Sequence, residues 1–264
     1  MKKINEHIVE WLKKELTKSH QKGFVIGISG GIDSAVVSTL IAETGYPVLC
    51  LTLPIHQNTS ESTMGDRHIQ WLMDKYPNVS VKGIDLSDEY DSLVKKFNTE
   101  NDELACVNTR SRLRMTTLYH FANSLGYLVA GTGNKIEDFG IKFFTKHGDG
   151  AVDLSPIGDL MKSEVYALGA YLGVNDEILK ARPTDGLWTD GRTDEDQIGA
   201  TYDELEWAMD ECEKKYPLER EIPEVIYTLS DYNERQKEVM KIYIKRYNGG
   251  LHKMKMPPIC KIEK

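Results

Sequence analysis

Hydrophobic positions in the first half of the chain follow two alternating spacings. An amphipathic helix over residues 3–19 is predicted by apolar residues near helical spacing, namely Ile4, Ile8, Leu12 and Leu16. Short apolar runs, typical of buried strands, then occupy residues 24–28, 48–53, 79–84 and 127–130. Strands that alternate with helical segments predict an α/β fold whose sheet is mostly parallel.

We therefore expect a doubly wound, mostly parallel sheet of about five strands with helices on both faces. Ligands bind such open sheets beyond the carboxyl ends of the strands. The segments that follow the first and fourth apolar runs lie at that edge. From about Asp159 onward the pattern becomes helical, with stretches predicted over residues 159–172, 201–214 and 223–247.

Two polar segments interrupt this pattern. Residues 54–62 and 182–196 lack hydrophobic periodicity, and the second is rich in Gly, Asp and Thr. Long loops in compact domains are commonly lids or binding loops, so we predict lid-type loops near both segments. A chain of 264 residues with 40% hydrophobic content is long enough for one large core, and we expect a single domain over residues 1–264.

The segment of most chemical interest is SGGIDSA at residues 29–35, directly after the first apolar run. Two glycines let the backbone approach a phosphate closely, and Ser29 and Ser34 add hydroxyl groups. The amphipathic stretch from Ala35 to Ala42 is predicted to be a helix, whose start offers unpaired N–H groups and the positive end of its dipole. The segment therefore predicts a phosphate cradle between a strand and a helix.

Asp33 is the unusual residue of this cradle. A carboxylate would repel a phosphate unless a divalent cation lay between them, so Asp33 indicates a metal. The alternative is an ordinary Gly-Ser turn with Asp33 as a helix cap. The segment lacks the lysine of a Walker A loop, and the dinucleotide pattern G-x-G-x-x-G fits it only with mismatches.

Composition limits the partners and the compartment. The formal net charge is −8, so nonspecific nucleic-acid binding is not expected, and no run approaches the roughly 20 apolar residues of a membrane span. The N-terminus has no apolar signal segment. The cysteines are far apart, without a C-x-x-C pair, and predict free thiols in a cytoplasmic protein: Cys50, Cys106, Cys212 and Cys260.

The segment from residue 108 to residue 153 supplies further charged and polar groups. Three arginines lie close together at positions 110, 112 and 114, either as a solvated basic face or as forks for a carboxylate or phosphate. Next come GTGNKIE at 131–137 and TKHGDGAVD at 145–153, which bring hydroxyl, carboxylate and ammonium groups to the ends of predicted strands.

The S-G-G-x-D-S cradle resembles the pyrophosphate loop of the N-type ATP pyrophosphatases. With the later motifs in the same order, and the tail HKMKMPPI at 252–259, the chain resembles the ammonia-dependent NAD synthetases over nearly its whole length. The resemblance implies an adenine nucleotide alpha hydrolase-like fold and a ligase that forms a carbon–nitrogen bond. In that family ATP adenylates deamido-NAD with release of pyrophosphate, and ammonia then displaces AMP to give NAD, the last step of NAD biosynthesis.

The resemblance also implies roles for individual residues. Asp33 and Glu137 would bind Mg²⁺. The positions that match ATP contacts are Gly27, Ile28, Ser29, Gly30, Gly31, Ile32, Asp33, Ser34, Thr132, Lys162 and Thr184. The positions that match deamido-NAD contacts are Arg112, Lys146, Asp153, His252 and Lys253.

Chemistry supports this inventory. An unactivated carboxylate does not accept ammonia, so its oxygen must first join a good leaving group. Asp33 and Lys162 are the predicted catalytic residues for that step, because charge develops on the phosphates. Ammonium must then lose a proton, and Asp149 or Asp153 is the predicted acceptor.

Three further expectations concern assembly and nitrogen supply. Glutamine-dependent relatives carry an additional amidase domain for which 264 residues have no room, so free ammonia is the expected donor. The resemblance implies a homodimer with deamido-NAD at the interface. Tyr119, Phe121 and Tyr127 would then face the partner, although aromatic residues at such positions more commonly belong to the core.

The chain departs from the family pattern at two places. The family commonly reads P-T-A-D-L where this chain has Pro183-Thr184-Asp185-Gly186-Leu187, and one extra residue lies between Glu137 and Thr145. The alternative functions are amidation of another carboxylate or nucleotide by an N-type ATP pyrophosphatase, and nonenzymatic ATP binding. Two metal carboxylates favour an enzyme over a sensor.

Overall fold

The computed structural model describes residues 1–56, 59–99, 101–184, 193–216, 220–223 and 232–262. The strands are β1 (Phe24–Gly27), β2 (Val48–Thr52), β3 (Val79–Gly83) and β4 (Leu128–Val129). The helices of the first half are α1 (Lys2–Lys18), α2 (Ile32–Glu43), α3 (Thr59–Lys75), α4 (Ser87–Phe97) and α5 (Glu103–Leu125). Those of the second half are the π-helical turn η1 (Lys135–Gly140), α6 (Lys162–Leu172), α7 (Asp176–Lys180), α8 (Asp194–Ile198), α9 (Tyr202–Glu213), α10 (Glu234–Gly250) and the short 3-10 turn η3 (Leu251–Lys253).

The strands form one parallel sheet in the order β3-β2-β1-β4. This confirms the predicted fold class. Among the described residues the sheet has four strands rather than about five, and an isolated parallel bridge between Ala130 and Leu154 occupies the edge beyond β4. That bridge joins a single pair of residues, so it does not extend into a fifth strand.

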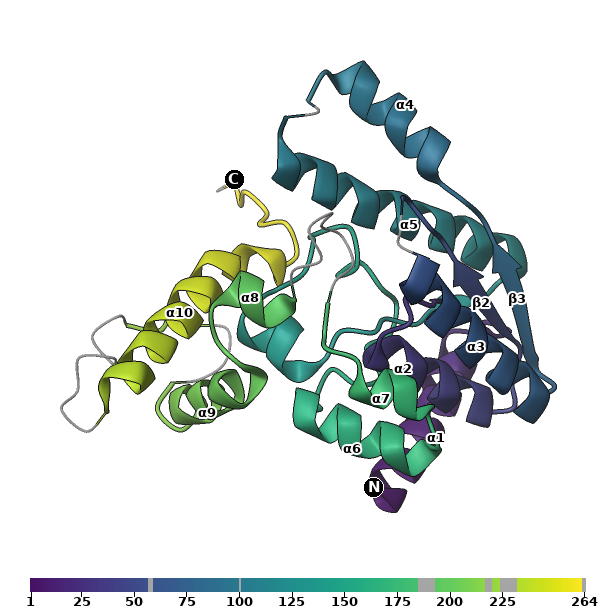
Figure 1. Cartoon of the computed structure of the whole chain (residues 1–264), viewed down its shortest axis with the longest axis horizontal. Coiled ribbons are helices and arrows are strands. Elements are labelled where there is room, and N and C mark those ends of the chain that lie inside the picture. Colours follow the sequence, from purple (N-terminus) through teal and green to yellow (C-terminus); the bar gives the residue numbers. More distant parts are fainter. Residues whose placement is uncertain (57–58, 100, 185–192, 217–219, 224–231, 263–264) are drawn as a thin grey trace.

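Helices cover both faces of the sheet (Figure 1). One face packs against α1, α2, α3 and α6 through a cluster of apolar side chains that includes Leu12, Leu40, Leu72 and Val165. The other face packs against α4 and α5 through a cluster that includes Val25, Val94 and Leu118. β1 lies inside the sheet and is buried on both sides, so the cradle that follows it is anchored by both layers.

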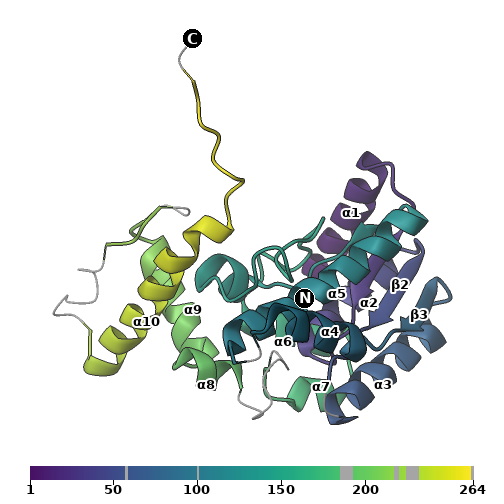
Figure 2. The same ribbon diagram turned by 90° about the horizontal axis from the view of Figure 1, so that it is seen from above.

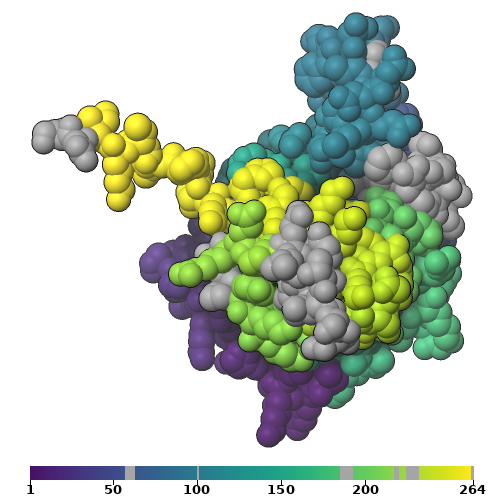
Figure 3. Space-filling model, turned by 90° about the vertical axis from the view of Figure 1, so that its left-hand side faces the viewer, coloured from purple at the N-terminus to yellow at the C-terminus, as the bar shows by residue number. Residues whose placement is uncertain are grey.

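The helices α9 and α10 lie beside the sheet layers and form a group of their own with η1 (Figure 2). Their core contains Leu205, Met240 and the stacked rings of Tyr243 and Tyr247, whose centroids are 6.0 Å apart. After η3 the C-terminal segment projects away from the body (Figure 3). No helix in the described ranges is long and apolar enough to cross a membrane.

The predicted helices are present with shifted ends. The stretch 3–19 is α1, which ends at Lys18 with Ser19 as its C-cap, and 201–214 is α9. The stretch 159–172 is helical only from Lys162, and the Glu164 carboxylate caps this start by accepting a hydrogen bond from the Met161 N–H at 2.9 Å. The stretch 223–247 corresponds to α10, which starts at Glu234 after its cap Asn233, and residues 224–231 lie outside the described residues.

The two segments predicted as lid-type loops are partly helical. Residues 59–62 of the interval 54–62 already belong to α3, and residues 57–58 lie outside the described residues. In the interval 182–196, α8 begins at Asp194 because Thr193 caps it by accepting a hydrogen bond from the Asp196 backbone N–H. Its Gly- and Asp-rich centre, 185–192, also lies outside the described residues. Capping chemistry at Thr193 is the signal that the loop interpretation overlooked.

Candidate functional site

The loop after β1 has the predicted strand–turn–helix form. Gly30 has a φ of +88°, a conformation that a side chain disfavours, so glycine is needed there. The hydroxyl of Ser29 accepts a hydrogen bond from the Gly31 N–H at 3.2 Å and lies 3.1 Å from the hydroxyl of Ser34. These contacts hold the loop in a tight curve over the start of α2.

The helix α2 begins at Ile32, three residues earlier than the predicted start at Ala35. Its N-cap is Gly31, with no side-chain cap hydrogen bond, so Asp33 lies in the first turn and does not act as the cap. The cap interpretation of Asp33 is therefore wrong. Its carboxylate instead accepts hydrogen bonds from Asn134 and Lys162, which belong to other parts of the chain.

Asp33, Glu137 and Lys162 meet from three separate elements. The Lys162 ammonium, at the first residue of α6, lies 2.6 Å from Asp33 Oδ2 and 2.9 Å from Glu137 Oε1. The Lys162 side chain is only 4% exposed. Buried charges require partners, and here one cation neutralises two carboxylates of α2 and η1.

Asn134 connects the same two acids and was missing from the predicted site. It is fully buried, donates from Nδ2 to Asp33 Oδ1 at 3.0 Å and accepts from the Glu137 N–H at 3.0 Å as the N-cap of η1. The neighbouring Gly133 has no room for a side chain, because a Cβ there would lie 1.8 Å from the carboxylate of Asp138. The G-T-G-N segment thus has a steric reason for glycine and a polar reason for asparagine.

The segment that follows Asn134 forms an unusual helix. η1 is a π-helical turn, in which the Ile141 N–H bonds the Ile136 carbonyl five residues earlier. A π turn contains more residues than an α turn and is frequent at functional sites. Within this turn the Glu137 carboxylate faces Lys162, with Oε1 2.9 Å from Nζ.

Tyr202 and Asp194 complete this network from α9 and α8. The Tyr202 hydroxyl lies 2.5 Å from Glu137 Oε1 and 3.2 Å from Asp194 Oδ2, and Lys162 Nζ lies 5.0 Å from the centre of its ring. Sequence reasoning missed both residues, because Tyr202 reads as an ordinary buried residue of an amphipathic helix. Only the fold brings them to Glu137.

The network sets the charge states of the site. Burial by itself lowers the pKa of Lys162, but Asp33 and Glu137 outweigh it and raise that pKa, so the ammonium stays charged. Burial raises the pKa of Asp33, and the nearby Glu137 acts in the same direction against Lys162. Burial also acts against the Glu137 carboxylate, yet Lys162 and the hydroxyl of Tyr202 lower its pKa overall. Burial raises the pKa of Tyr202, so its hydroxyl remains a donor.

A cleft of about 180 Å³ opens over the network. Every residue from Ser29 to Ser34 lines it, as do Thr132, Glu137, Asp149, Lys162 and Thr184. Gly27 ends β1 just below the cleft, and Ile28 is buried. Most positions matched to ATP contacts therefore share one cleft, whose additional lining includes Asp138, Phe143, Tyr166 and Asp194.

The two candidate acids for ammonium differ in position. Asp149 lines the cleft, accepts from the Ser111 hydroxyl at 2.6 Å, and burial raises its pKa. Asp153 lies at the sheet edge, where it accepts from the Tyr119 hydroxyl at 3.0 Å and from the Val129 N–H at 2.8 Å. It is absent from the cleft lining, so of the two acids only Asp149 is placed for proton transfer there.

The other positions matched to deamido-NAD form a cationic group, defined as Arg112, Lys146, His252 and Lys253. Arg112 Nε donates to the Lys146 carbonyl at 3.3 Å, and Lys146 Nζ donates to the His252 carbonyl at 2.8 Å. Lys253 Nζ donates to two further carbonyls, at 2.9 and 2.7 Å. Burial lowers the pKa of Lys253. Within the described ranges none of the four forms an ion pair, so the positive charges of Arg112, Lys146 and Lys253 are not compensated by a carboxylate at contact distance.

The other two arginines of the cluster at 110–114 have different surroundings. The Arg110 guanidinium lies 4.9 Å from the centre of the Tyr90 ring, and Arg114 Nε donates to the Leu53 carbonyl at 2.9 Å. The three side chains therefore do not form one fork. Arg112 alone joins the cationic group.

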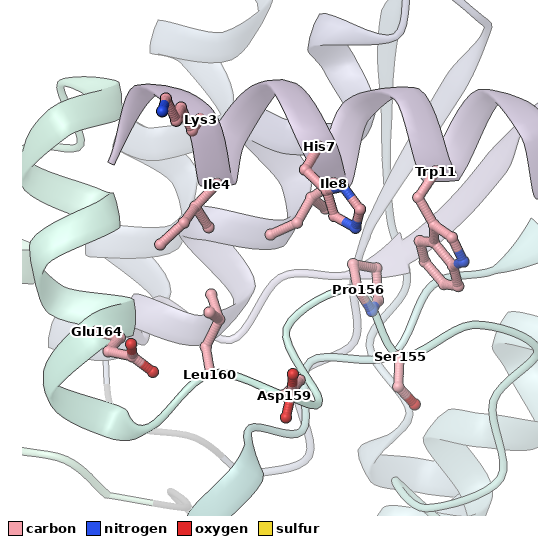
Figure 4. A pocket seen from close by; sticks show the side chains of 10 residues that line it. All are labelled: Lys3, Ile4, His7, Ile8, Trp11, Ser155, Pro156, Asp159, Leu160 and Glu164. Carbon is pink, nitrogen blue, oxygen red and sulfur yellow. The ribbon is translucent and has the colours of Figure 1, made fainter.

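A larger groove of about 620 Å³ lies elsewhere, between α1 and residues 155–164 (Figure 4). Ile4, Ile8 and Trp11 of α1 face Pro156 and Leu160 across it. It contains none of the predicted site residues. We therefore place the chemistry in the smaller cleft, where the buried charges and the cradle converge.

Comparisons with known proteins show the family of this chain. The family model described as NAD synthase matches residues 4–257. The chain belongs to the NAD synthase family. The NH(3)-dependent NAD(+) synthetase of Syntrophomonas wolfei is 36% identical over 266 residues, covering 98% of this chain and 96% of that protein. The corresponding protein of Carboxydothermus hydrogenoformans is 40% identical over 207 residues, covering 76% of this chain and 82% of the relative.

Two solved structures resemble the NAD synthase fold of this chain over nearly its full length. The NMN synthetase of Francisella tularensis superposes with a TM-score of 0.83 at 31% identity, covering 99% of this chain and 98% of that chain. The NH3-dependent NAD synthetase of Campylobacter jejuni, solved with nitrate, superposes with a TM-score of 0.74 at 27% identity, covering 98% of each chain.

Proposed function

We propose that this NAD synthase family member is a ligase that converts deamido-NAD to NAD with ATP and ammonia, through a deamido-NAD adenylate. The observation that carries the proposal is the Asp33–Lys162–Glu137 network at the end of a phosphate cradle. The cradle suits the pyrophosphate that leaves, and the acids suit a metal that neutralises it. Full-length relatives with this activity in their names support the same reaction.

The chain's own residues perform three tasks in the first step. The N–H groups and hydroxyls of residues 29–34 bind the departing phosphates. Lys162 supplies a fixed positive charge for the phosphate oxygens, and its burial makes that charge effective. The cleft walls hold the attacking carboxylate and ATP in line, which contributes by positioning.

Asp33 and Glu137 fit a magnesium ion. The described residues contain no cluster of three or more His, Cys, Asp or Glu side chains suited to a metal. Mg²⁺ commonly uses one or two carboxylates together with substrate phosphates and water, and two carboxylates beside a phosphate cradle meet that requirement. When bound, the ion would stabilise negative charge on the phosphates.

In the second step Asp149 is the proposed proton acceptor for ammonium. Its carboxylate faces the cleft, and its hydrogen bonds from Ser111 and from the Thr145 N–H hold it in place. Because burial raises its pKa, it is a better base than an ordinary carboxylate. Ammonia formed there replaces AMP on the acyl carbon.

The cationic group supports a phosphate-bearing acceptor. Arg112, Lys146 and Lys253 donate to carbonyl oxygens and keep their charge available for an anion. Deamido-NAD carries a pyrophosphate that suits such a group. A second candidate acceptor is the carboxylate precursor of NMN, because the NMN synthetase superposes with the higher TM-score of the two structures, 0.83 against 0.74.

One assay distinguishes these acceptors. Purified protein is incubated with ATP, Mg²⁺, ammonium and either deamido-NAD or nicotinate mononucleotide, and AMP, pyrophosphate and the amide product are measured. We expect all three products in equal amounts with deamido-NAD. Pyrophosphate release that does not depend on either acceptor contradicts the proposal. If nicotinate mononucleotide is converted and deamido-NAD is not, the second candidate replaces the first.

We further propose a cytoplasmic homodimer. The described cysteines are free thiols, which suits a reducing compartment. On α4 and α5, Phe97 is 57% exposed and Leu104 is 64% exposed, and exposed apolar residues favour association. The aromatic residues predicted to face the partner, Tyr119, Phe121 and Tyr127, pack partly buried against the core of the sheet. Sedimentation equilibrium tests the dimer, and a mass of one chain contradicts it.

A further inference from the structure

Tyr202 joins the C-terminal helical group to the predicted metal carboxylates. Its side chain belongs to the apolar core shared by η1, α9 and α10, and it is 6% exposed. Its hydroxyl oxygen lies 2.5 Å from Glu137 Oε1, and its ring lies 5.0 Å from Lys162 Nζ. A single side chain therefore contacts both Glu137 and the cation that neutralises it.

The position of Tyr202 is set by its own surroundings. Thr201 and Glu204 form a capping box that fixes the start of α9, and the Tyr202 N–H donates to Glu195 Oε1 of α8 at 3.0 Å. Backbone and ring are thus held by α8, α9 and the apolar core. Because Glu137 is not needed to place the hydroxyl, the hydroxyl is a fixed point against which Glu137 is oriented.

Two donors converge on one oxygen of Glu137. Lys162 and Tyr202 both bind Oε1, at 2.9 and 2.5 Å. Lys162 has a second task, since its charge also serves the phosphates in the proposed function. The Tyr202 hydroxyl also lies 3.2 Å from Asp194 Oδ2, but at 2.5 Å Glu137 Oε1 is its nearer acceptor, and this bond does not depend on the position of Lys162.

Resting on the proposed function, we propose that Tyr202 is a positioning residue of the reaction, which orients the Glu137 carboxylate for the metal that accompanies ATP. Asn134 holds the backbone N–H of Glu137 and the carboxylate of Asp33, while Tyr202 holds the carboxylate of Glu137. Tyr202 touches neither phosphate nor acceptor in this role. Its effect passes through Glu137.

The test is the variant Tyr202→Phe, which keeps the ring and removes the hydroxyl. Binding of the Mn²⁺–ATP complex to the full chain is measured by calorimetry without acceptor. Removal of a partner that orients a metal ligand typically weakens metal binding about 10–100-fold, and we expect a loss in that range. The Mg²⁺ concentration for half-maximal turnover should rise in parallel, with a smaller change in kcat at saturating Mg²⁺.

Tyr243→Phe is the matched control. Tyr243 lies in α10, in the same apolar core, and is 1% exposed. We expect this variant to bind Mn²⁺–ATP within about twofold of the wild type, since loss of a hydroxyl from this core does not itself affect Glu137. If Tyr202→Phe binds Mn²⁺–ATP as tightly as Tyr243→Phe, the positioning role is overturned.

A crystal structure of the wild-type chain with Mn²⁺ and ATP gives a second test that needs no variant. We expect the Tyr202 hydroxyl to remain within hydrogen-bond distance of Glu137. A hydroxyl that has separated from Glu137 overturns the inference. Both measurements omit the acceptor, so they can succeed even where the amidation assay fails, and the assay can succeed where they fail.

Discussion

The cleft and the cationic group handle charge in opposite ways. In the cleft, the Lys162 ammonium is buried and shared between Asp33 and Glu137 at 2.6 and 2.9 Å. In the cationic group, Lys146 and Lys253 lie against backbone carbonyls, without an ion pair in the described part of the chain. In the cleft the buried charges balance one another beside the phosphate cradle, whereas the cationic group has no carboxylate partner and suits the anion of the proposed acceptor.

This difference assigns the two regions different predicted roles, catalysis in the cleft and acceptor binding in the cationic group. Paired buried charges are costly to break and therefore fix geometry, whereas partly exposed cations bound to carbonyls remain available to a ligand. Variants in the cleft should accordingly reduce stability and kcat. Variants in the cationic group should raise the KM of the acceptor.

Lys162→Met should have the largest effect. The change leaves Asp33 and Glu137 buried without their cation, and breaking a buried pair in this way costs about 3–5 kcal/mol of folding stability. Urea unfolding measures the loss. Lys180→Met is the control, because Lys180 pairs with Asp176 at an exposed position and its loss should change stability far less. Equal losses in the two variants would contradict the contrast.

Asp33→Asn should follow, as a loss of rate. Removing one preorganised electrostatic group from a reacting centre typically costs about 2.7–4 kcal/mol of barrier, or roughly 100- to 1,000-fold in kcat. Steady-state pyrophosphate release measures it. Asp159→Asn, in the groove beside α1, changes an exposed carboxylate and should leave kcat unchanged. If Asp33→Asn kept the wild-type kcat, the result would contradict a catalytic role for the cleft.

His68 tests the effect of burial on a titratable side chain that is hydrogen-bonded to a hydroxyl instead of a charged group. It is 1% exposed, bonded to the Ser38 hydroxyl at 2.9 Å, and burial lowers its pKa to about 4. Because the unfolded ring protonates near pH 6.5, the fold loses about 3 kcal/mol as pH falls from about 6.5 to 4, and none of this loss occurs above pH 6.5. Urea unfolding of the wild type and His68→Gln over this range measures the difference. A parallel pH dependence in both proteins would exclude His68 as its source.

Lys253→Met should have the smallest effect, and it should change the KM of the acceptor instead of stability or kcat. Loss of a charge-assisted bond to a phosphate is worth about 1.5–3 kcal/mol, so the KM of the acceptor should rise by at least about tenfold while kcat changes little. Lys255→Met, two residues along the exposed C-terminal segment, is the control and should match the wild type. A fall in kcat without a change in KM would place Lys253 with the cleft instead.

The sequence predicts correctly those elements that depend on a local pattern of apolar and polar residues. Each apolar run that predicted a strand contains one, and the cradle follows β1 as expected. The chain carries Asp33, Glu137 and Lys162 in separate motifs, and the family resemblance assigned them to one site. The structure brings them within hydrogen-bond distance.

The rest depends on tertiary contacts. Tyr202 and Asp194 have no local pattern that links them to Glu137, because the link arises from the packing of α8 and α9 against η1. Helical segments were expected between the strands, but without bounds for α3 and α4, although Tyr90, Leu93 and Val94 of α4 lie at helical spacing. Asp153 was predicted with the catalytic acids from its closeness in sequence to Asp149, yet the edge of the sheet separates their side chains.

An isotope experiment tests the central claim, adenylation of a carboxylate in this cleft, most directly. Deamido-NAD labelled with ¹⁸O in its carboxylate is converted with ATP and ammonium, and the AMP produced is analysed by phosphorus NMR. Attack of the carboxylate oxygen on the α-phosphorus transfers that oxygen to AMP, so we predict one ¹⁸O atom in each AMP phosphate. AMP that contains no ¹⁸O would contradict the adenylate and with it the proposed mechanism.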